Sequence, residues 1–250
     1  MERLDNVVQS YAWGSNEAIA ALQGRAVPSP GPEAELWLGA HPLASSRVRG
    51  EHGTRRLTEH IADAPDATLG ARSLAAFGPT LPFLLKVLAA ERPLSLQAHP
   101  DLAQAREGFA REEAAGIPRD AAVRSYRDAN HKPELICALT PFDALCGFRA
   151  PRELLALFDA LDVAALAYAR EALSRSPDAR GLREVFTGLF TLGEPERCAL
   201  VSAVVTACAS LANGPFGDDA AWTLRFAALY PGDIGVVVAL MLRRVRLSPG

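Results

Sequence analysis

Apolar and polar residues alternate along residues 94–99 of this 250-residue chain, which is the pattern typical of a β-strand. As a strand, this segment would turn three apolar side chains to one face and three polar side chains to the other. The polar three are Ser95, Gln97 and His99. A second segment, Glu134–Leu139, begins with a carboxylate and continues as an apolar run, so we predict another strand there.

The remaining pattern predicts short strands with irregular connections over residues 1–149. Apolar or alternating runs such as Ala34–Ala40 and Leu81–Ala90 are separated by clusters of Pro and Gly, which mark turns. Helices are predicted to interrupt these strands over Leu57–Ala64 and Asp101–Glu113.

From Pro151 the chain becomes rich in Ala and Leu, with apolar residues recurring at intervals of three or four, which predicts helices. Pro151 suits the first turn of such a helix. Further helices are predicted over residues 181–190, 194–211 and 218–229. A turn signal at residues 230–235 is followed by β-branched residues, so strands are expected to resume.

These patterns predict an α+β fold in three parts. Residues 1–149 form a β domain, residues 150–229 form a helical domain, and residues 230–250 begin a returning β segment. With 49% hydrophobic and 22% charged residues, the chain can bury a sizeable core.

Charge and composition narrow the class of protein. A net charge of −3 gives no electrostatic footprint for nucleic acid or a membrane surface, so neither is expected as a partner. The four cysteines form no CxxC pair, which favours free thiols in a reducing compartment. The charged N-terminus has no apolar leader pattern, and the apolar run at residues 234–242 is too short to span a bilayer. We therefore expect a soluble, cytoplasmic protein.

The polar positions of the two predicted strands suggest a partial metal site. Gln97 and His99 would share a strand face, and Glu134 would add a carboxylate from another strand. Such N and O ligands suit a borderline metal such as zinc. Since glutamine is a poor zinc ligand in general, Gln97 could equally be an ordinary hydrogen-bonded strand residue.

Lysine is used sparingly in this chain. Of 26 Lys and Arg residues only Lys86 and Lys132 are lysines. Arg does not replace a compact ammonium that must exchange a proton or fit beside a phosphate, so both lysines are candidate functional residues. The alternative is that two lysines occur by chance. No nucleotide-binding glycine loop, GxSxG elbow or HExxH motif is present.

Seven segments resemble those of the type I phosphomannose isomerases, and they occur in that family's order. They are Tyr11–Ser15, Ala34–Pro42, Leu81–Leu88, Leu94–Asp101, Tyr126–Glu134, Phe142–Phe148 and Tyr230–Gly235.

The resemblance implies a zinc enzyme on a cupin-like, jelly-roll β scaffold with an inserted helical domain. It implies interconversion of mannose 6-phosphate and fructose 6-phosphate through a zinc-stabilised enediol, with a small sugar phosphate as partner and a monomeric chain. By resemblance, zinc is held by Gln97, His99 and Glu134. Lys132 is the implied acid–base group. The implied lining of the substrate pocket is Ser95, Lys86, Trp13 and Glu35.

The chain departs from the family pattern at its end. It stops at a turn signal, Ser248–Gly250, where a following strand is expected. The family's fourth zinc ligand, a histidine, and a catalytic arginine come later, so the C-terminal β unit is expected to be incomplete. One alternative is therefore a catalytically inactive truncated homologue that binds zinc or sugar phosphate. A cupin oxygenase is less favoured, because such iron sites use two histidines and a carboxylate.

Overall fold

The computed structural model describes residues 2–50, 53–211 and 213–250, and it divides into two compact units, Met1–Leu94 and Ser95–Gly250. Both helices and strands are present, and the strands form small sheets of two or three members. The predicted α+β class is therefore confirmed. The jelly-roll scaffold and the three-part division of the chain stay predictions.

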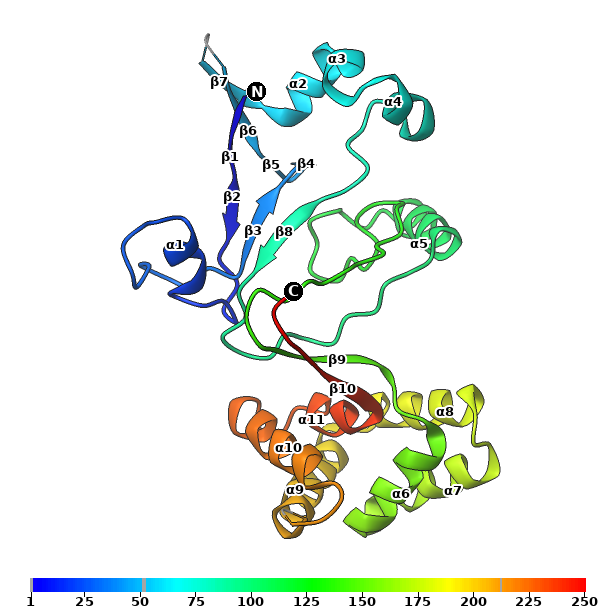
Figure 1. The fold of residues 1–250 in the computed structure, drawn as a ribbon. Helices are drawn as coiled ribbons and strands as arrows, with labels where there is room; N and C mark the ends of the chain where they lie inside the picture. Colours follow the sequence, from blue (N-terminus) through cyan, green and yellow to red (C-terminus); the bar gives the residue numbers. More distant parts are fainter. Residues whose placement is uncertain (1, 51–52, 212) are drawn as a thin grey trace. The chain divides into compact units, whose positions relative to one another are not determined.

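The first unit contains an antiparallel sheet with the order β2-β3-β8 (Figure 1). Its strands are β2 (Val7–Gln9), β3 (Glu35–Leu38) and β8 (Leu85–Leu88). The predicted strands within Ala34–Ala40 and Leu81–Ala90 are confirmed, although each observed strand is shorter than its apolar run.

Alternation along β3 gives this sheet two different faces. Leu36 and Leu38 point to an apolar face, where Ile19 of helix α1 (Ala18–Leu22) is fully buried. Glu35 and Trp37 therefore point to the opposite face. The apolar cluster contains Val8, Ile19, Leu36, Leu38, Val87 and Ala89.

The described residues of the first unit also form a second small sheet, a short hairpin and three further helices. The sheet is β1 (Arg3–Asp5), β6 (Arg47–Gly50) and β7 (Gly53–Arg56), and the hairpin pairs β4 (Ala40–His41) with β5 (Ala44–Ser45). The helices are α2 (Leu57–Asp63), α3 (Pro65–Leu69) and α4 (Ala71–Phe77). The helix predicted over Leu57–Ala64 is thus confirmed.

Two segments that were predicted to be strands have an irregular backbone in the structure. Neither residues 94–99 nor residues 134–139 form a strand, so both strand predictions are wrong. Alternation describes which side chains share a face, whereas a strand also needs a neighbour that accepts and donates its backbone hydrogen bonds. Within the part of the chain that the structure describes, neither segment pairs with a strand. The Ala138 carbonyl instead accepts one bond from the Gly250 amide, at 3.0 Å.

Helix α5 (Leu102–Ala114) follows where it was predicted. It begins at a capping box. The backbone N–H of Gln104 donates to Asp101 Oδ1 at 2.8 Å, and the backbone N–H of Asp101 donates to Gln104 Oε1 at 3.0 Å. This reciprocal pair fixes the N-cap of the helix, Asp101, two residues after His99.

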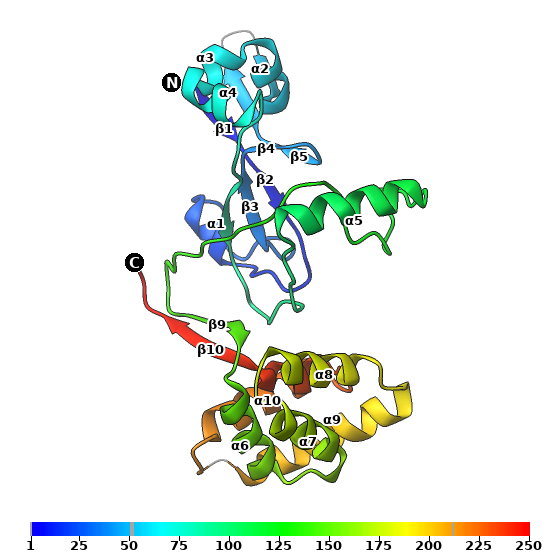
Figure 2. The same cartoon turned by 90° about the vertical axis from the view of Figure 1, so that its right-hand side faces the viewer.

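The predicted helical block is confirmed (Figure 2). Its helices are α6 (Pro151–Leu161), α7 (Ala167–Arg175), α8 (Ala179–Phe190), α9 (Glu194–Ser210) and α10 (Gly217–Leu229), with a 3₁₀ turn η1 (Ala164–Leu166) before α7. Their apolar stripes form one core, in which Phe158 is fully buried. Within the described ranges, no helix is both long enough and apolar enough to span a bilayer.

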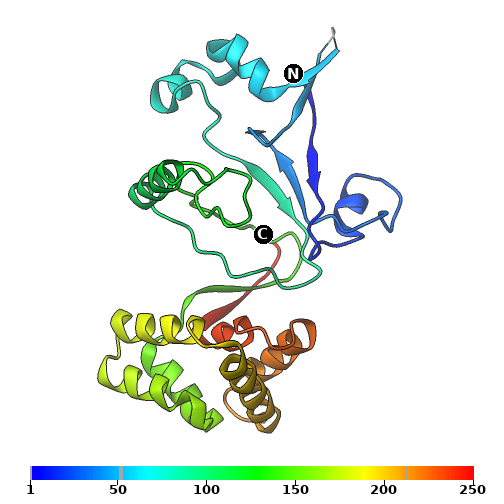
Figure 3. The same cartoon turned by 180° about the vertical axis from the view of Figure 1, so that it is seen from behind.

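Strands were expected to resume after residues 230–235, but the chain first forms helix α11 (Gly235–Val238) and a 3₁₀ turn η2 (Ala239–Met241). Consecutive valines here are buried in the helical core, and this packing overrides their strand preference. Strand β10 (Leu242–Leu247) follows and pairs antiparallel with β9 (Phe142–Phe148) (Figure 3).

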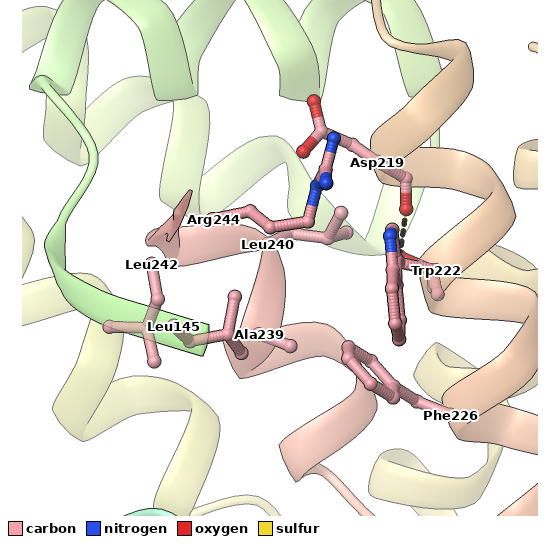
Figure 4. A pocket seen from close by; sticks show the side chains of 9 residues that line it. Leu145, Asp219, Trp222, Phe226, Ala239, Leu240, Leu242 and Arg244 are labelled. Atoms are coloured by element: carbon pink, nitrogen blue, oxygen red, sulfur yellow. Dashed lines mark hydrogen bonds between the residues drawn. The ribbon is translucent and has the colours of Figure 1, made fainter. Parts of the chain in front are cut away.

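Two arginines attach the β9–β10 ribbon to the helices. Arg149, whose side chain is 8% exposed, donates to the Leu240 carbonyl at 3.2 Å and pairs with Asp219 at 2.7 Å and with Glu153. Arg244 pairs with Asp218 of α10 at 2.8 Å. Figure 4 shows Arg244, Asp219 and Trp222 around a small cavity at this junction.

Replacing Phe158 with alanine tests the helical core. We expect Phe158→Ala to lower the free energy of unfolding by about 3–5 kcal/mol, because it leaves a cavity in a fully buried position. Urea unfolding followed by helical circular dichroism measures this loss. Phe190→Ala is the control, because Phe190 is 50% exposed and should cost much less. Equal losses in the two variants would contradict the assigned core.

Candidate functional site

A buried carboxylate, Glu35, lies on the polar face of the β2-β3-β8 sheet, at the first position of the central strand β3. Its side chain is only 11% exposed. Trp37 Nε1 donates to Glu35 Oε2 at 2.6 Å, and Lys86 Nζ lies 3.8 Å from the same oxygen. Lys86 also lies 5.3 Å from the centroid of the Trp37 ring, which is cation–π distance. The two predicted residues Glu35 and Lys86 are thus brought together.

Strand pairing produces this group directly. Trp37 of β3 lies opposite Lys86 of β8, and Glu35 shares the face of Trp37 because it is two residues away. Sequence reasoning overlooked Trp37, although the alternation along β3 already placed it beside Glu35.

Trp13, another predicted pocket residue, lies in a turn of the same unit. Its ring stacks on Tyr11 with a centroid distance of 5.7 Å. Its carbonyl accepts the amide N–H groups of Glu91 at 2.9 Å and Arg92 at 3.1 Å, which holds the turn against the segment that follows β8.

In the second unit, the structure brings His99 and Glu134 together. His99 Nε2 lies 3.8 Å from Glu134 Oε2, and the two side chains are 34% and 57% exposed. They are 35 positions apart in sequence, and helix α5 lies between them. Their approach is therefore a tertiary contact rather than the consequence of a shared sheet.

Gln97 is held by its neighbour two residues earlier. Its Nε2 atom donates to Ser95 Oγ at 2.7 Å and to the Ser95 carbonyl at 3.2 Å. These bonds use the amide nitrogen and orient the side chain. The Oε1 atom is the one that could donate an electron pair to a cation.

The donor chemistry of these residues fits zinc. Zinc bonds of about 2.0–2.2 Å to N and O ligands place two tetrahedral ligands about 3.4 Å apart. The 3.8 Å separation of His99 Nε2 and Glu134 Oε2 needs only a small adjustment to reach that value. Among the described residues, no group of three or more His, Cys, Asp and Glu side chains could hold a metal. A zinc site here would therefore depend on the amide oxygen of Gln97.

Lys132 is bound by a carboxylate that the sequence reasoning missed. Its Nζ atom donates to both Asp128 oxygens, at 2.7 and 2.9 Å, and Asp128 Oδ1 also accepts the Asn130 amide at 2.9 Å. Asp128 precedes Lys132 by four positions, but the segment is not helical, so this spacing alone did not indicate the contact.

The predicted site residues are divided between the two units. The first unit carries Trp13, Glu35 and Lys86, and the second carries Ser95, Gln97, His99, Lys132 and Glu134. Each group is built by contacts inside its own unit. The first presents Lys86 beside a buried carboxylate. The second presents His99 beside Glu134 and Lys132 beside Asp128.

Known proteins match this chain closely. Residues 1–151 match the family "Phosphomannose isomerase type I, catalytic domain". The whole chain is 41% identical to mannose-6-phosphate isomerase of Escherichia coli (strain K12) over 251 residues, which is 62% of that protein. It is 32% identical to the Homo sapiens protein of the same name over 268 residues, covering 99% of this chain and 61% of that protein.

Solved structures agree with these relatives. A crystal structure of mannose 6-phosphate isomerase from Salmonella typhimurium, bound to substrate and to zinc, matches with a TM-score of 0.87 at 40% identity. A zinc-bound holo structure of mannose 6-phosphate isomerase gives the same TM-score and identity. Each match covers all of this chain and 62% of the other. The chain thus spans about three fifths of the length of the relatives it matches.

Replacing Trp37 with phenylalanine tests the polar sheet face. Trp37→Phe keeps an aromatic ring but removes the N–H group that Glu35 accepts. We expect it to lower the free energy of unfolding by about 1–3 kcal/mol, because a buried carboxylate loses a hydrogen bond. Urea unfolding measures the loss. Trp13→Phe, which can keep the stack on Tyr11, is the control. A Trp37→Phe variant as stable as this control would contradict the assigned role.

Proposed function

The chain belongs to the type I phosphomannose isomerase family, and we propose that it interconverts mannose 6-phosphate and fructose 6-phosphate with zinc as cofactor. The observation that carries this proposal is the pairing of His99 with Glu134, in a chain whose full length is 41% identical to a mannose-6-phosphate isomerase. The relative from Salmonella typhimurium, with zinc and substrate bound, supports the same metal and substrate class.

The reaction moves a proton between C2 and C1 of the sugar through an enediol. We assign the proton transfer to Lys132, whose ammonium is held by the Asp128 carboxylate at 2.7 Å and so occupies a defined position. The Lys86 ammonium, held beside Glu35 and over Trp37, would bind the substrate phosphate as a point charge. The Ser95 hydroxyl would donate a hydrogen bond to the sugar phosphate. Trp13 and Glu35 would line the pocket.

Gln97, His99 and Glu134 are the residues that would hold zinc, through an amide oxygen, an imidazole nitrogen and a carboxylate oxygen. When bound, zinc supplies a Lewis acid for the oxygen on which negative charge develops. His99 and Glu134 come from either side of α5, so they could orient a bound group without the support of a common strand.

We extend the proposal to the architecture and setting. Residues 1–149 would form a cupin-like metal-site domain of jelly-roll type, residues 150–229 a helical domain, and residues 230–250 the start of a returning β segment. The four cysteines are free, which favours a reducing compartment such as the cytoplasm. We expect a monomer.

A non-catalytic function is the second candidate. In that case the chain would keep Gln97, His99 and Glu134 and would bind zinc or sugar phosphate without turnover. The two proposals differ in whether this chain alone converts substrate.

A coupled assay of mannose 6-phosphate conversion by the purified, zinc-loaded chain separates the two candidates. We expect turnover that disappears when zinc is removed by a chelator. Lys132→Arg should keep zinc and lower turnover by about 100-fold or more, because general acid–base catalysis contributes about 10²–10⁴-fold. A folded, zinc-loaded chain without turnover would favour the binding module, and near-normal turnover in Lys132→Arg would remove Lys132 from the mechanism.

The metal ligands can be tested without the assay. Loss of an outer-shell partner lowers metal affinity by about 10–100-fold. Gln97→Ala and Glu134→Ala each remove a proposed direct ligand, so each should lower zinc affinity by more than this. Competition with a chromogenic chelator measures the affinity, and circular dichroism should show the helical block intact. Glu107→Ala, which removes an exposed carboxylate on α5, is the matched control. Unchanged zinc affinity in the two ligand variants would refute the site.

A further inference from the structure

A fully buried arginine, Arg124, ties the segment after α5 back onto that helix. Its side chain is 0% exposed. Its Nε atom donates to the Tyr126 carbonyl at 2.7 Å, and one terminal nitrogen donates to the Ile117 carbonyl. The other terminal nitrogen donates to Glu113 Oε1 at 2.8 Å. The guanidinium also lies 5.2 Å from the centroid of the Phe109 ring.

Glu112 of α5 completes this attachment. Its carboxylate lies 2.9 Å from Arg124 Nε and accepts the amide N–H groups of Tyr126 at 2.8 Å and Ser125 at 3.2 Å. Glu112 is itself buried, with 8% of its surface exposed. One buried ion pair therefore satisfies backbone donors and acceptors of the same short segment, and this fixes the segment more strictly than apolar packing would.

Close packing at Gly108 adds a second constraint. A Cβ atom at Gly108 would lie 2.5 Å from the Tyr126 ring, so the ring occupies the space that a side chain would take. Tyr126 is therefore held through its backbone by Arg124 and Glu112, and through its ring by the surface of α5.

This attachment lies on the path between the two candidate zinc ligands. His99 comes two residues before Asp101, the N-cap of α5, and Glu134 comes eight residues after Tyr126. With Tyr126 fixed on α5, only residues 127–134 remain to bring Glu134 to His99. Closing a short segment costs less conformational entropy than closing the whole intervening chain.

We propose that Arg124 is a positioning residue for the metal site, which sets the return path that presents the Glu134 carboxylate to His99. This inference rests on the proposed function for the metal, whereas the attachment itself is independent of it. Arg124 and Glu112 act through the backbone of residues 125–126, and Asp128 continues the same path by holding Lys132.

The test uses the full chain and two measurements. Amide hydrogen exchange of residues 125–134 in the metal-free protein reports the attachment, and chelator competition reports zinc affinity. Arg124→Met should increase exchange in this segment and lower zinc affinity by about 10–100-fold, as loss of an outer-shell partner does. Arg124→Lys should fall between, because its ammonium can pair with Glu112 but cannot reach every acceptor of a guanidinium.

Arg119→Met is the matched control. Arg119 also pairs with Glu113, at 3.2 Å, and lies 5.0 Å from the centroid of the Phe109 ring, but its side chain is 65% exposed. Hydrogen bonds from Arg119 and Arg124 together hold the pKa of Glu113 below its ordinary value. Since the bonds to the Ile117 and Tyr126 carbonyls come from Arg124, loss of Arg119 should leave exchange of residues 125–134 and zinc affinity unchanged.

Gly108→Ala keeps the proposal testable if Arg124→Met disturbs folding more widely. Alanine favours the helix, yet its methyl group would displace the Tyr126 ring. We therefore expect weaker zinc binding and faster exchange in residues 125–134 while α5 stays protected.

Each outcome has a defined meaning. Wild-type exchange in both Arg124→Met and Gly108→Ala would overturn the attachment. Faster exchange with wild-type zinc affinity would overturn the positioning role. A wild-type chain that binds no zinc would refute the metal site and the positioning role of Arg124 toward zinc. The exchange data would then still test whether Arg124 and Glu112 attach residues 125–126 to α5.

Discussion

A buried guanidinium must place its N–H groups on acceptors, and this requirement organises the second unit. Arg124 meets it by joining α5 to the segment of residues 117–126, and Arg149 meets it by joining β9 to the helical block. Across the described residues, no buried side-chain nitrogen or oxygen lacks a hydrogen-bond partner. Because an unpaired buried charge costs several kcal/mol, of order 3–5, each arginine effectively specifies one arrangement of the segments it connects.

The first unit applies the same requirement to a carboxylate. Glu35 is buried on the polar side of a sheet whose other side is a small apolar core. Trp37 and Lys86 satisfy it, and as a result the Lys86 ammonium is held at a defined place on the sheet surface. A lysine fixed in this way loses less side-chain entropy when it binds an anion than a freely moving lysine would.

Sequence patterns predicted the elements whose formation depends on consecutive residues. They did not predict elements and contacts that depend on a partner distant in sequence. The helices from Pro151 onward follow from apolar spacing and from a proline in the first turn, since both are properties of a few consecutive residues. The strands expected at residues 94–99 and 134–139 do not form, because alternation does not supply a neighbouring strand. The valines near residue 236 became helical because the core buried them from all sides. At the candidate site, residue types singled out His99 and Glu134, and alternation along β3 places Trp37 beside Glu35. The contacts of Arg124 and Asp128 depend on chain paths that no spacing reveals.

The wrong strand predictions also change how the candidate metal site has to work. A shared strand would have fixed Gln97 and His99 rigidly before any metal arrived. Instead, Gln97 donates a hydrogen bond to Ser95, and His99 precedes the N-cap of α5 by two residues. Glu134 lies 3.8 Å from His99, eight residues after Tyr126. Ligands that share no strand have more freedom than ligands on one sheet, so part of the binding free energy of a metal would be spent on ordering them. Under the proposed role of Arg124, the affinity of such a site would depend on α5 and Arg124 as well as on the three proposed ligands.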